Sequence, residues 1–275
     1  KEFLEKNNLQ ADLIASHGHT IFHQTDRGFT FQLGHGASIA ASAGLPTVSD
    51  FRSLDVALGG EGAPLVPFGD LQLFPAYESC LNLGGIANIS FQKQGSIIAY
   101  DIAPANMILN RLFAAVAEGE FDFNGNTGRK GCLDHELLEK LNALEYYSSP
   151  IPKSIGKEWV MDAVVPLLEN AASEAIDQLR TYYEHLSIQI ASSFEVAEIK
   201  SDVLVTGGGA KNGFLMELLR ARGLSIVIPE DSIIDYKEAL IFAFLGLNRF
   251  LEKTNTLRSV TGARKDSAGG NIFLP

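Results

Sequence analysis

The sequence LNLGGIANIS at residues 81–90 carries the strongest structural signal in this chain. Its pattern predicts a strand, a tight turn at Gly84 and Gly85 and a second strand, followed by a third strand that ends at the carboxylate of Asp101. Glycine has no Cβ, so the turn can take positive φ and bring its N–H groups close to a ligand, and successive turn N–H groups suit a phosphate. Asp101 would then lie where a general base reaches a hydroxyl beside that phosphate. An ordinary hairpin turn is the favoured interpretation of Gly-Gly on its own.

A second glycine cluster favours the phosphate-binding interpretation over the ordinary hairpin turn. A short β-branched run at residues 202–206 leads into Gly207–Gly209 and then into a helical stretch at residues 213–222. Strand-to-helix glycine turns are where α/β folds bind nucleotides. The dinucleotide spacing G-x-G-x-x-G is absent because its third glycine falls on Asn212, and the chain has no G-x-x-x-x-G-K-[ST] loop. Two glycine turns of different design predict a nucleotide held in a cleft by a less common fold.

Composition limits the class of protein. The 275 residues are 46% hydrophobic and 20% charged, which is ordinary for a globular protein with room for two lobes. A net charge of −11 argues against wholesale binding to nucleic acid or to an anionic membrane. Two cysteines are too few for a disulfide framework, and the longest apolar run, residues 239–247, is too short to span a bilayer. We expect a soluble, cytoplasmic protein.

Strand and helix signals alternate along the chain, and this alternation predicts an α/β sandwich. A loop rich in glycine and proline separates the first elements from the motif at residues 81–90. Besides that motif, we expect strands at residues 11–16, 29–34, 47–49 and 225–229, and helices at 37–43, 106–118, 133–144 and 236–251, with a helical section at 157–199 broken near Pro166 and before Ser187.

Four of the six histidines fall near the N-terminus, at His17, His19, His23 and His35. On a strand, His17 and His19 would share one face, which is a ligand pattern in some metal-dependent hydrolases. Two other interpretations remain open. These histidines could lie in a polar loop, or they could line a cleft and hydrogen-bond a polar substrate.

Eight segments carry a family resemblance: residues 16–21, 47–52, 59–67, 81–88, 152–158, 205–212, 238–239 and 259–263. Taken in this order, they closely resemble the anhydro-N-acetylmuramic acid kinases of bacterial peptidoglycan recycling. The resemblance covers nearly the whole chain. It implies a two-lobed actin-like ATPase (ribonuclease H-like) fold, with nucleotide and sugar in the cleft between the lobes. The first lobe would comprise residues 1–76 and 252–275, and the second would comprise residues 77–251.

The resemblance also implies a reaction and a homodimer. The 1,6-anhydro bond of the amino sugar is cleaved with water while ATP, with Mg²⁺, phosphorylates O6 to give N-acetylmuramic acid 6-phosphate. Asp101 matches the family's catalytic aspartate and is the candidate base. A strand-end aspartate that caps the helix near Asn106 is the alternative. The other implied site residues are Gly84, Gly85, Gly207, Gly208, Gly209 and Asn212 for the nucleotide, and His17, Asp50, Arg52, Gly62, Pro64 and Glu238 for the sugar.

Two of these assignments have structural alternatives. Arg52 could bind the lactyl carboxylate of muramic acid in a forked pair, or it could form an ion pair with Asp50 or Asp55. Glu238 could face the sugar, or it could be a carboxylate at a helix N-terminus that the helix dipole favours.

The chain also departs from the family pattern. The Gly-Thr-Ser-x-Asp-Gly phosphate hairpin is absent, and we expect the chain to be a fragment of a longer protein. If the hairpin is truly missing, the alternative is a sugar-binding or regulatory module that has lost catalysis. Ala103 and Ala105 replace glycines, Asn110 replaces an aspartate, and His19 replaces a glutamine. These changes put the identity of the sugar in question but keep the candidate base.

Overall fold

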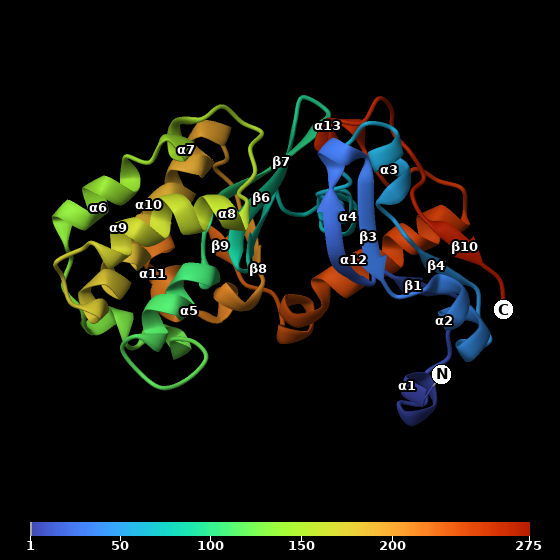
Figure 1. Cartoon of the computed structure of the whole chain (residues 1–275), viewed down its shortest axis with the longest axis horizontal. Helices are drawn as coiled ribbons and strands as arrows, with labels where there is room; N and C mark the ends of the chain where they lie inside the picture. Colours follow the sequence, from blue (N-terminus) through green and yellow to red (C-terminus); the bar gives the residue numbers. More distant parts are fainter. Residues whose placement is uncertain (1) are drawn as a thin grey trace. The chain divides into compact units, whose positions relative to one another are not determined.

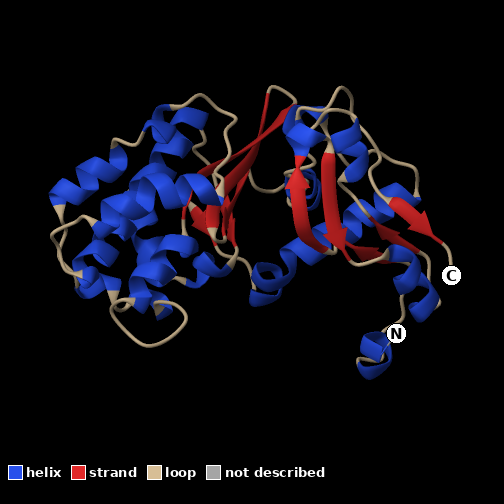
Figure 2. Ribbon diagram, viewed as in Figure 1, coloured by secondary structure: helices blue, strands red, loops and turns tan. Residues whose placement is uncertain are grey.

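The computed structural model describes residues 2–275 and is an α/β protein, as the sequence predicts (Figures 1 and 2). The chain divides into two compact units, which are described separately below. Unit 1 comprises Lys1–Pro75, Lys93–Ile98 and Tyr236–Pro275, and unit 2 comprises Ala76–Gln92 and Ala99–Asp235. The cleft expected between the lobes stays a prediction.

Unit 2 is built on a five-stranded sheet in the order β7-β6-β5-β8-β9. β6 runs antiparallel to β5, whereas β8 is parallel to β5 and β9 is parallel to β8. A hairpin followed by parallel crossovers is the ribonuclease H-like arrangement that the family resemblance implies. The strands are β5 (Ser79–Leu83), β6 (Ile86–Lys93), β7 (Ser96–Pro104), β8 (Val203–Thr206) and β9 (Ile226–Val227).

Helices gather beside this sheet (Figure 1), and the long helix α10 (Ala175–Ala197) is central among them. Its buried residues Leu179, Tyr182, Leu186 and Ile190 follow the helical period. The expected break before Ser187 is wrong, because α10 continues through this residue to Ala197. The Ser187 hydroxyl donates to the Glu184 carbonyl at 2.8 Å, within the helix. The other helices are α5 (Asn106–Ala114), α6 (His135–Asn142), α7 (Glu145–Ser148), α8 (Lys157–Trp159), α9 (Val165–Glu169) and α11 (Gly213–Ala221), with the π-helical segment η4 (Val160–Val164) before α9.

Unit 1 contains a three-stranded sheet, a separate two-stranded ribbon and several helices. In the sheet, the central strand β4 pairs in parallel with β1 and antiparallel with β10. The elements are β1 (Ile14–Ser16), β2 (His19–Gln24), β3 (Phe29–Leu33), β4 (Thr47–Ser49), β10 (Asn271–Phe273), α1 (Glu2–Lys6), α2 (Gly36–Ala43), α3 (Ser53–Ala57), α4 (Val66–Leu73), α13 (Arg258–Thr261) and α12 (Asp231–Phe250), whose first five residues belong to unit 2.

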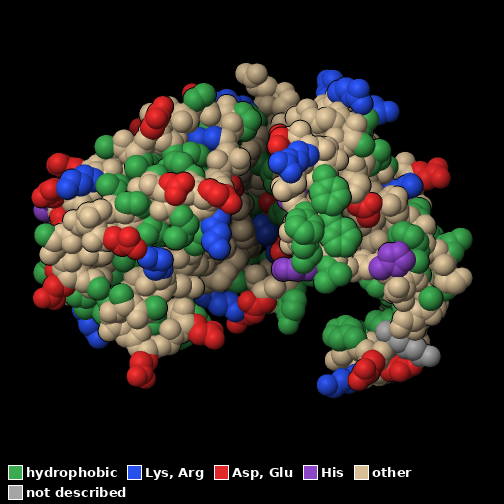
Figure 3. Space-filling model, in the orientation of Figure 1, with side chains coloured by type: hydrophobic (Ala, Val, Ile, Leu, Met, Phe, Trp, Pro, Cys, Tyr) green, Lys and Arg blue, Asp and Glu red, His purple; other side chains and the backbone are tan. Residues whose placement is uncertain are grey.

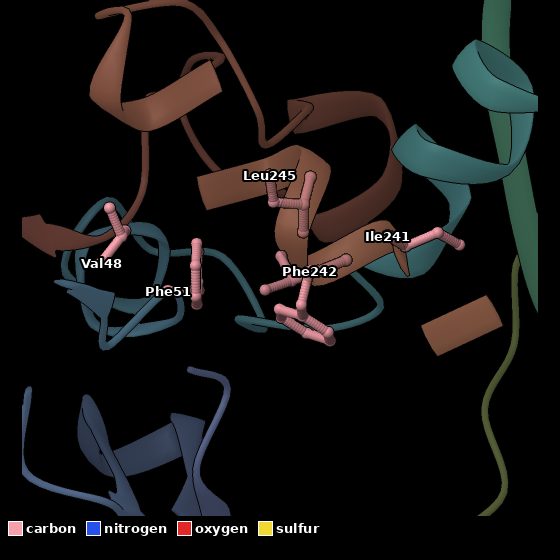
Figure 4. Close-up of a cluster of buried hydrophobic side chains, with 6 residues drawn as sticks. Val48, Phe51, Ile241, Phe242 and Leu245 are labelled. Carbon is pink, nitrogen blue, oxygen red and sulfur yellow. The ribbon is translucent and has the colours of Figure 1, made fainter. Parts of the chain in front are cut away.

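The core of unit 1 forms where α12 packs on the end of β4 and the segment after it (Figure 4). Ile241, Phe242 and Leu245 of α12 are buried against Val48 and Phe51. This packing explains why Tyr236–Pro275 belongs to unit 1, whereas the sequence placed the helix up to Leu251 in the second lobe. The helix also begins at Asp231, five residues before the predicted start.

The strand β2 is the main element that the sequence interpretation missed, whereas its ribbon partner β3 matches the strand predicted at residues 29–34. The two strands of this ribbon pair antiparallel with a register shift between Thr20 and Phe22. Hydrophobic side chains gather on its outer face (Figure 3). A half-buried strand usually alternates between apolar and polar residues. All six residues of β2 are exposed, so β2 has no buried face that would require this alternation. The exposed hydrophobic residues are Ile21, Phe22, Phe29, Phe31 and Leu33. Across residues 2–275, we find no helix with the length and apolar character needed to cross a membrane.

The core of unit 1 allows a matched test on one helix. We expect Ile241→Ala to lower the free energy of unfolding by about 3 kcal/mol, because it leaves a cavity in a tightly packed core. Ile241 is 0% exposed, and its side chain also packs against Gly69. Leu247→Ala, at a position that is 46% exposed, should change stability by less than about 0.5 kcal/mol. Urea denaturation of both variants provides the comparison, and equal effects would contradict the packing described here.

Candidate functional site

The two glycine turns, separated by 122 residues from Gly85 to Gly207, lie next to each other in unit 2. They follow β5 and β8, which pair in parallel with Asn82 opposite Thr206. A Cβ placed on Gly207 would lie 2.8 Å from the Leu83 carbonyl oxygen, and one on Gly209 would lie 2.7 Å from the Leu83 Cβ. The carboxyl ends of neighbouring parallel strands are the usual ligand-binding edge of an α/β sheet.

The five glycines divide into two kinds. Gly207 has φ +79°, and Gly207 and Gly209 both press against β5, so their lack of a side chain is required by the fold itself. A Cβ on Gly84, Gly85 or Gly208 would meet no protein atom closer than 3.5 Å. Neither Gly84 nor Gly85 uses the positive φ that glycine permits. At these three positions a Cβ would make only ordinary van der Waals contacts, so the fold itself does not require glycine there.

A row of polar side chains crosses the sheet beside the turns. Asn82 pairs with Asn88 on β6 and with Thr206 on β8, so all three side chains share one face. The Thr206 hydroxyl is fully buried and has no hydrogen-bond partner among residues 2–275. The side chains of Asn82 and Asn88 likewise make no hydrogen bond with the part of the chain that the structure describes. This row was not predicted from the sequence. Asn82 lies two residues before Gly84, and this strand spacing could have indicated that its side chain lies on the same face as the turn.

Two further asparagines flank the turns. Asn106, the first residue of α5, donates from Nδ2 to the Leu83 carbonyl at 3.0 Å, and its backbone N–H donates to the Gly84 carbonyl at 3.1 Å. Asn212, a predicted nucleotide residue, is the N-cap of α11. Its Oδ1 accepts from the Leu215 N–H at 3.1 Å, and its Nδ2 donates to the Tyr183 hydroxyl at 2.7 Å. Its side chain is therefore engaged within the fold.

Asp101 is held rigidly within β7. The strand continues three residues past it to Pro104, so the prediction that the strand ends at Asp101 is wrong. Its backbone N–H donates to the Lys153 carbonyl at 3.0 Å, and its own carbonyl accepts from the Tyr146 hydroxyl at 2.6 Å. The carboxylate Oδ2 accepts from the Ile155 N–H at 2.9 Å. The cap of α5 is Ala105 without a side-chain bond, which rules out the helix-cap interpretation of Asp101.

The surroundings of Asp101 favour its protonated form. Burial raises the pKa of the carboxyl group, and the Ile155 N–H opposes this rise only in part. No lysine, arginine or histidine among residues 2–275 pairs with it, and its Oδ1 has no protein partner. The nearby Lys153 is not a counter-ion, because its Nζ donates to the carbonyls of Tyr146 and Tyr147 at 2.7 and 3.3 Å. A carboxylate with one oxygen anchored and one oxygen available can act as a base.

In unit 1, three predicted sugar residues form one hydrogen-bonded chain. Arg52 donates from Nε and Nη2 to His17 Nε2 at 3.2 and 2.7 Å, and from Nη1 to the Gly62 carbonyl at 2.6 Å. His17 Nδ1 lies 2.9 Å from the Gly18 carbonyl, so Nδ1 carries the proton and Nε2 accepts. Burial and the Arg52 charge lower the pKa of His17, which keeps the ring neutral.

The ion-pair alternative for Arg52 is wrong. The guanidinium contacts neither Asp50 nor Asp55, and burial lowers its pKa while Glu238 acts in the opposite direction. Asp50 Oδ1 accepts from the Ser53 hydroxyl at 2.5 Å, and its Oδ2 accepts from Asn271 Nδ2 at 2.9 Å. Arg52 is therefore a largely buried cation whose protein partners are neutral.

Glu238 and Pro64 complete the predicted sugar set. Glu238 is exposed in the third turn of α12 and not at its N-terminus, so the helix-dipole interpretation is wrong. Its charge acts on both His17 and Arg52, which places it near them. Pro64 is exposed and follows a cis peptide bond in the loop that contains Gly62.

The histidine pair does not form the strand pattern that a metal site would need. His17 lies between β1 and β2 and His19 begins β2, with Gly18 at φ +73° turning the chain between them. Within residues 2–275 there is no group of three or more His, Cys, Asp or Glu side chains placed to hold a metal ion.

Comparison with known proteins gives the family. The family profile described as "Anhydro-N-acetylmuramic acid kinase" matches residues 1–275. A protein of that name from Aliivibrio fischeri is 37% identical over 273 residues, covering 94% of this chain and 74% of its own length. Another, from Sulfurovum, is 36% identical over 282 residues, covering 99% of this chain and 77% of its own length.

Solved structures are more distant. The activator of the 2-hydroxyisocaproyl-CoA dehydratase from Clostridium difficile with bound ADPNP superposes with a TM-score of 0.43 at 15% identity, covering 75% of this chain and 68% of that chain. The assignment rests on the sequence matches, which extend over the whole chain and agree with one another. The chain belongs to the anhydro-N-acetylmuramic acid kinase family of enzymes.

Proposed function

We propose that Asp101 is the general base of an ATP-dependent kinase that opens 1,6-anhydro-N-acetylmuramic acid with water and phosphorylates its O6. The observation that carries this proposal is the carboxylate itself. It has one oxygen anchored by Ile155 and one available, and it lies on the sheet that bears both glycine turns. The product is N-acetylmuramic acid 6-phosphate, which returns cell-wall sugar to metabolism.

The bond changes balance without a further reactant. Asp101 takes a proton from water as the water oxygen bonds to the anomeric carbon, and the bond from that carbon to O6 breaks. The departing O6 bonds to the γ-phosphorus, and the bond from that phosphorus to the bridging oxygen of ADP breaks. A base with a raised pKa suits this reaction, because its proton affinity is closer to that needed near neutral pH.

The nucleotide phosphates are assigned to the open glycine edge of unit 2. Gly84, Gly85 and Gly208 leave room for phosphate oxygens. The partly exposed Asn82 amide supplies a neutral polar group beside them. Mg²⁺ retains several water ligands when bound to nucleotides, and this side chain suits contact with such waters. When bound, the ion neutralises charge on the phosphates.

The sugar is assigned to the His17–Arg52–Gly62 chain of unit 1. A guanidinium has five N–H donors, and Arg52 uses three of them within the protein. One N–H therefore remains on each terminal nitrogen, and this pair matches a carboxylate in the forked geometry. The lactyl carboxylate distinguishes muramic acid from other amino sugars. Arg52 would bind it, with Glu238 and the loop of Gly62 and Pro64 contacting the rest of the sugar.

The remaining assignments follow the family resemblance. We propose a cytoplasmic homodimer without nucleic-acid or membrane partners. The net charge of −11 and the presence of only two cysteines support this setting. Light scattering coupled to size-exclusion chromatography would measure the dimer directly.

Replacement of the base tests the proposed chemistry. Asp101→Asn should lower kcat by at least about 10²-fold, because the amide cannot take the proton from water. Turnover of 1,6-anhydro-N-acetylmuramic acid in H₂¹⁸O should place the label at C1 of the product and not in its phosphate, as mass spectrometry would show.

The melting temperature is the control for this variant. Because the folded-state pKa of Asp101 is raised, its ionisation opposes folding at neutral pH, and Asn should not lower the melting temperature. Full activity in Asp101→Asn, or label in the phosphate, would refute the proposal.

The pH dependence of kcat/KM should report the same carboxylate. Activity requires ionised Asp101, so kcat/KM should fall as the pH drops through its pKa, which lies above the ordinary 3.8. Circular dichroism over the same range would exclude acid unfolding. An acid limb at or below the ordinary aspartate value would contradict the burial effect.

The division of the glycines gives a paired test of nucleotide binding. Gly208→Ala should leave the protein folded but raise the KM for ATP on the order of tenfold, because the methyl group enters space open to ligand. Gly209→Ala should instead cost about 1–3 kcal/mol of stability, because its Cβ would lie 2.7 Å from Leu83. Unfolding curves and ATP kinetics of both variants would separate the two effects. Unchanged ATP kinetics in Gly208→Ala would remove this position from the nucleotide site.

A further inference from the structure

Asp55 is a buried carboxylate without a cationic partner. The side chain, in α3, is 0% exposed, and no lysine, arginine or histidine among residues 2–275 pairs with it. Its Oδ2 accepts from the Gly62 N–H at 2.8 Å, and its Oδ1 accepts from the Thr261 hydroxyl at 2.7 Å. Burying an ionisable group is costly unless its hydrogen bonds compensate, so these two contacts require an explanation.

The loop at residues 59–64 is wrapped closely around this carboxylate. A Cβ on Gly60 would lie 2.3 Å from Asp55 Oδ2, so only glycine fits beside it. The Gly60 N–H donates to the Asp55 carbonyl at 2.9 Å, and the Glu61 N–H donates to the Thr261 carbonyl at 2.8 Å. Gly62 itself has φ +62°. The path of the loop is therefore determined at three successive residues by contacts to Asp55 and Thr261.

The consequence of this anchoring reaches Arg52. The N–H of Gly62 is held by Asp55, and the carbonyl of the same residue accepts from Arg52 Nη1 at 2.6 Å. The other edge of the guanidinium is held by His17. The Gly62 carbonyl and His17 therefore fix the direction of the two remaining N–H groups together.

We propose that Asp55 is a positioning residue for sugar recognition: through Gly62 it orients Arg52 so that the two free N–H groups of the guanidinium meet a carboxylate ligand. This inference rests on the proposed function, in which Arg52 binds the lactyl carboxylate. Carboxylate suits the task because it only accepts, so it holds an N–H and an O–H donor at once. A charged acceptor also forms the stronger hydrogen bond.

Binding of two sugars tests the proposal. Calorimetry would compare 1,6-anhydro-N-acetylmuramic acid with 1,6-anhydro-N-acetylglucosamine, which lacks the lactyl group. Asp55→Ala should weaken binding of the first sugar about tenfold and that of the second by less than about threefold. Thr261→Val is the matched control, because it removes the other hydrogen bond of Asp55 while retaining the bond to Gly62. It should leave both affinities within about twofold.

A purely structural role predicts a different pattern. Equal losses for the two sugars in Asp55→Ala, or the same losses in Thr261→Val, would overturn the proposal. If Asp55→Ala fails to fold by its melting curve, Asp55→Asn provides the test, because it retains an acceptor oxygen and the side-chain volume. Asp55→Asn should then weaken binding of the sugar with the lactyl group more than binding of the sugar without it, as expected for Asp55→Ala.

A second readout is independent of the ligand. Burial lowers the pKa of His17 most, and the charges of Arg52 and His19 lower it further, while the Gly18 carbonyl and Glu238 raise it. If Asp55 orients Arg52, the His17 pKa measured by NMR should rise in Asp55→Ala, as in Arg52→Met, and stay unchanged in Thr261→Val. A pKa that rises in Arg52→Met but not in Asp55→Ala would refute the positioning role. A rise in both variants without any preference for the lactyl sugar in the wild type would instead refute the function assigned to Arg52.

Discussion

The parallel pairing of β5 with β8 is the interaction on which the arrangement of the two glycine turns in unit 2 depends. Four consecutive residue pairs, ending with Asn82 opposite Thr206, bring the two glycine turns to one edge of the sheet. The same register aligns Asn88, Asn82 and Thr206 on one face. A shift of one residue in this pairing would turn those polar groups to the opposite face and separate the turns.

Burial shifts the pKa values of two predicted site residues, one in each unit, in opposite directions. It raises the pKa of Asp101 and lowers the pKa of His17, because in each case the charged form loses solvation. The proton affinity of the carboxylate increases, and the imidazole becomes a neutral acceptor for Arg52. Arg52 is left as a cation with neutral partners, and this imbalance is what makes it suited to an anionic group.

Several sequence predictions were confirmed, and the errors share a cause. The strand–turn–strand at residues 81–90 and the strand before Gly207 appear in the structure. The predicted break near Pro166 is wrong, because helical structure continues from Lys157 to Glu169 and is interrupted only after it. The predicted break before Ser187, the late start of α12 and the missing β2 were wrong. Local propensity could not reveal these features, because packing on distant elements stabilises the two helices and β2 has no buried alternating face.

Local sequence was sufficient for the α/β class, the two glycine turns, the candidate base and, through ordered motifs, the family. Only the tertiary structure separated Gly207 and Gly209, which pack on Leu83, from Gly84, Gly85 and Gly208, where a Cβ would make only ordinary van der Waals contacts. It alone revealed that Arg52 bonds to His17 and Gly62 and that Asp55 holds Gly62. Contacts between residues far apart in sequence depend on strand register and burial, and neither property is encoded in the spacing of the residues themselves.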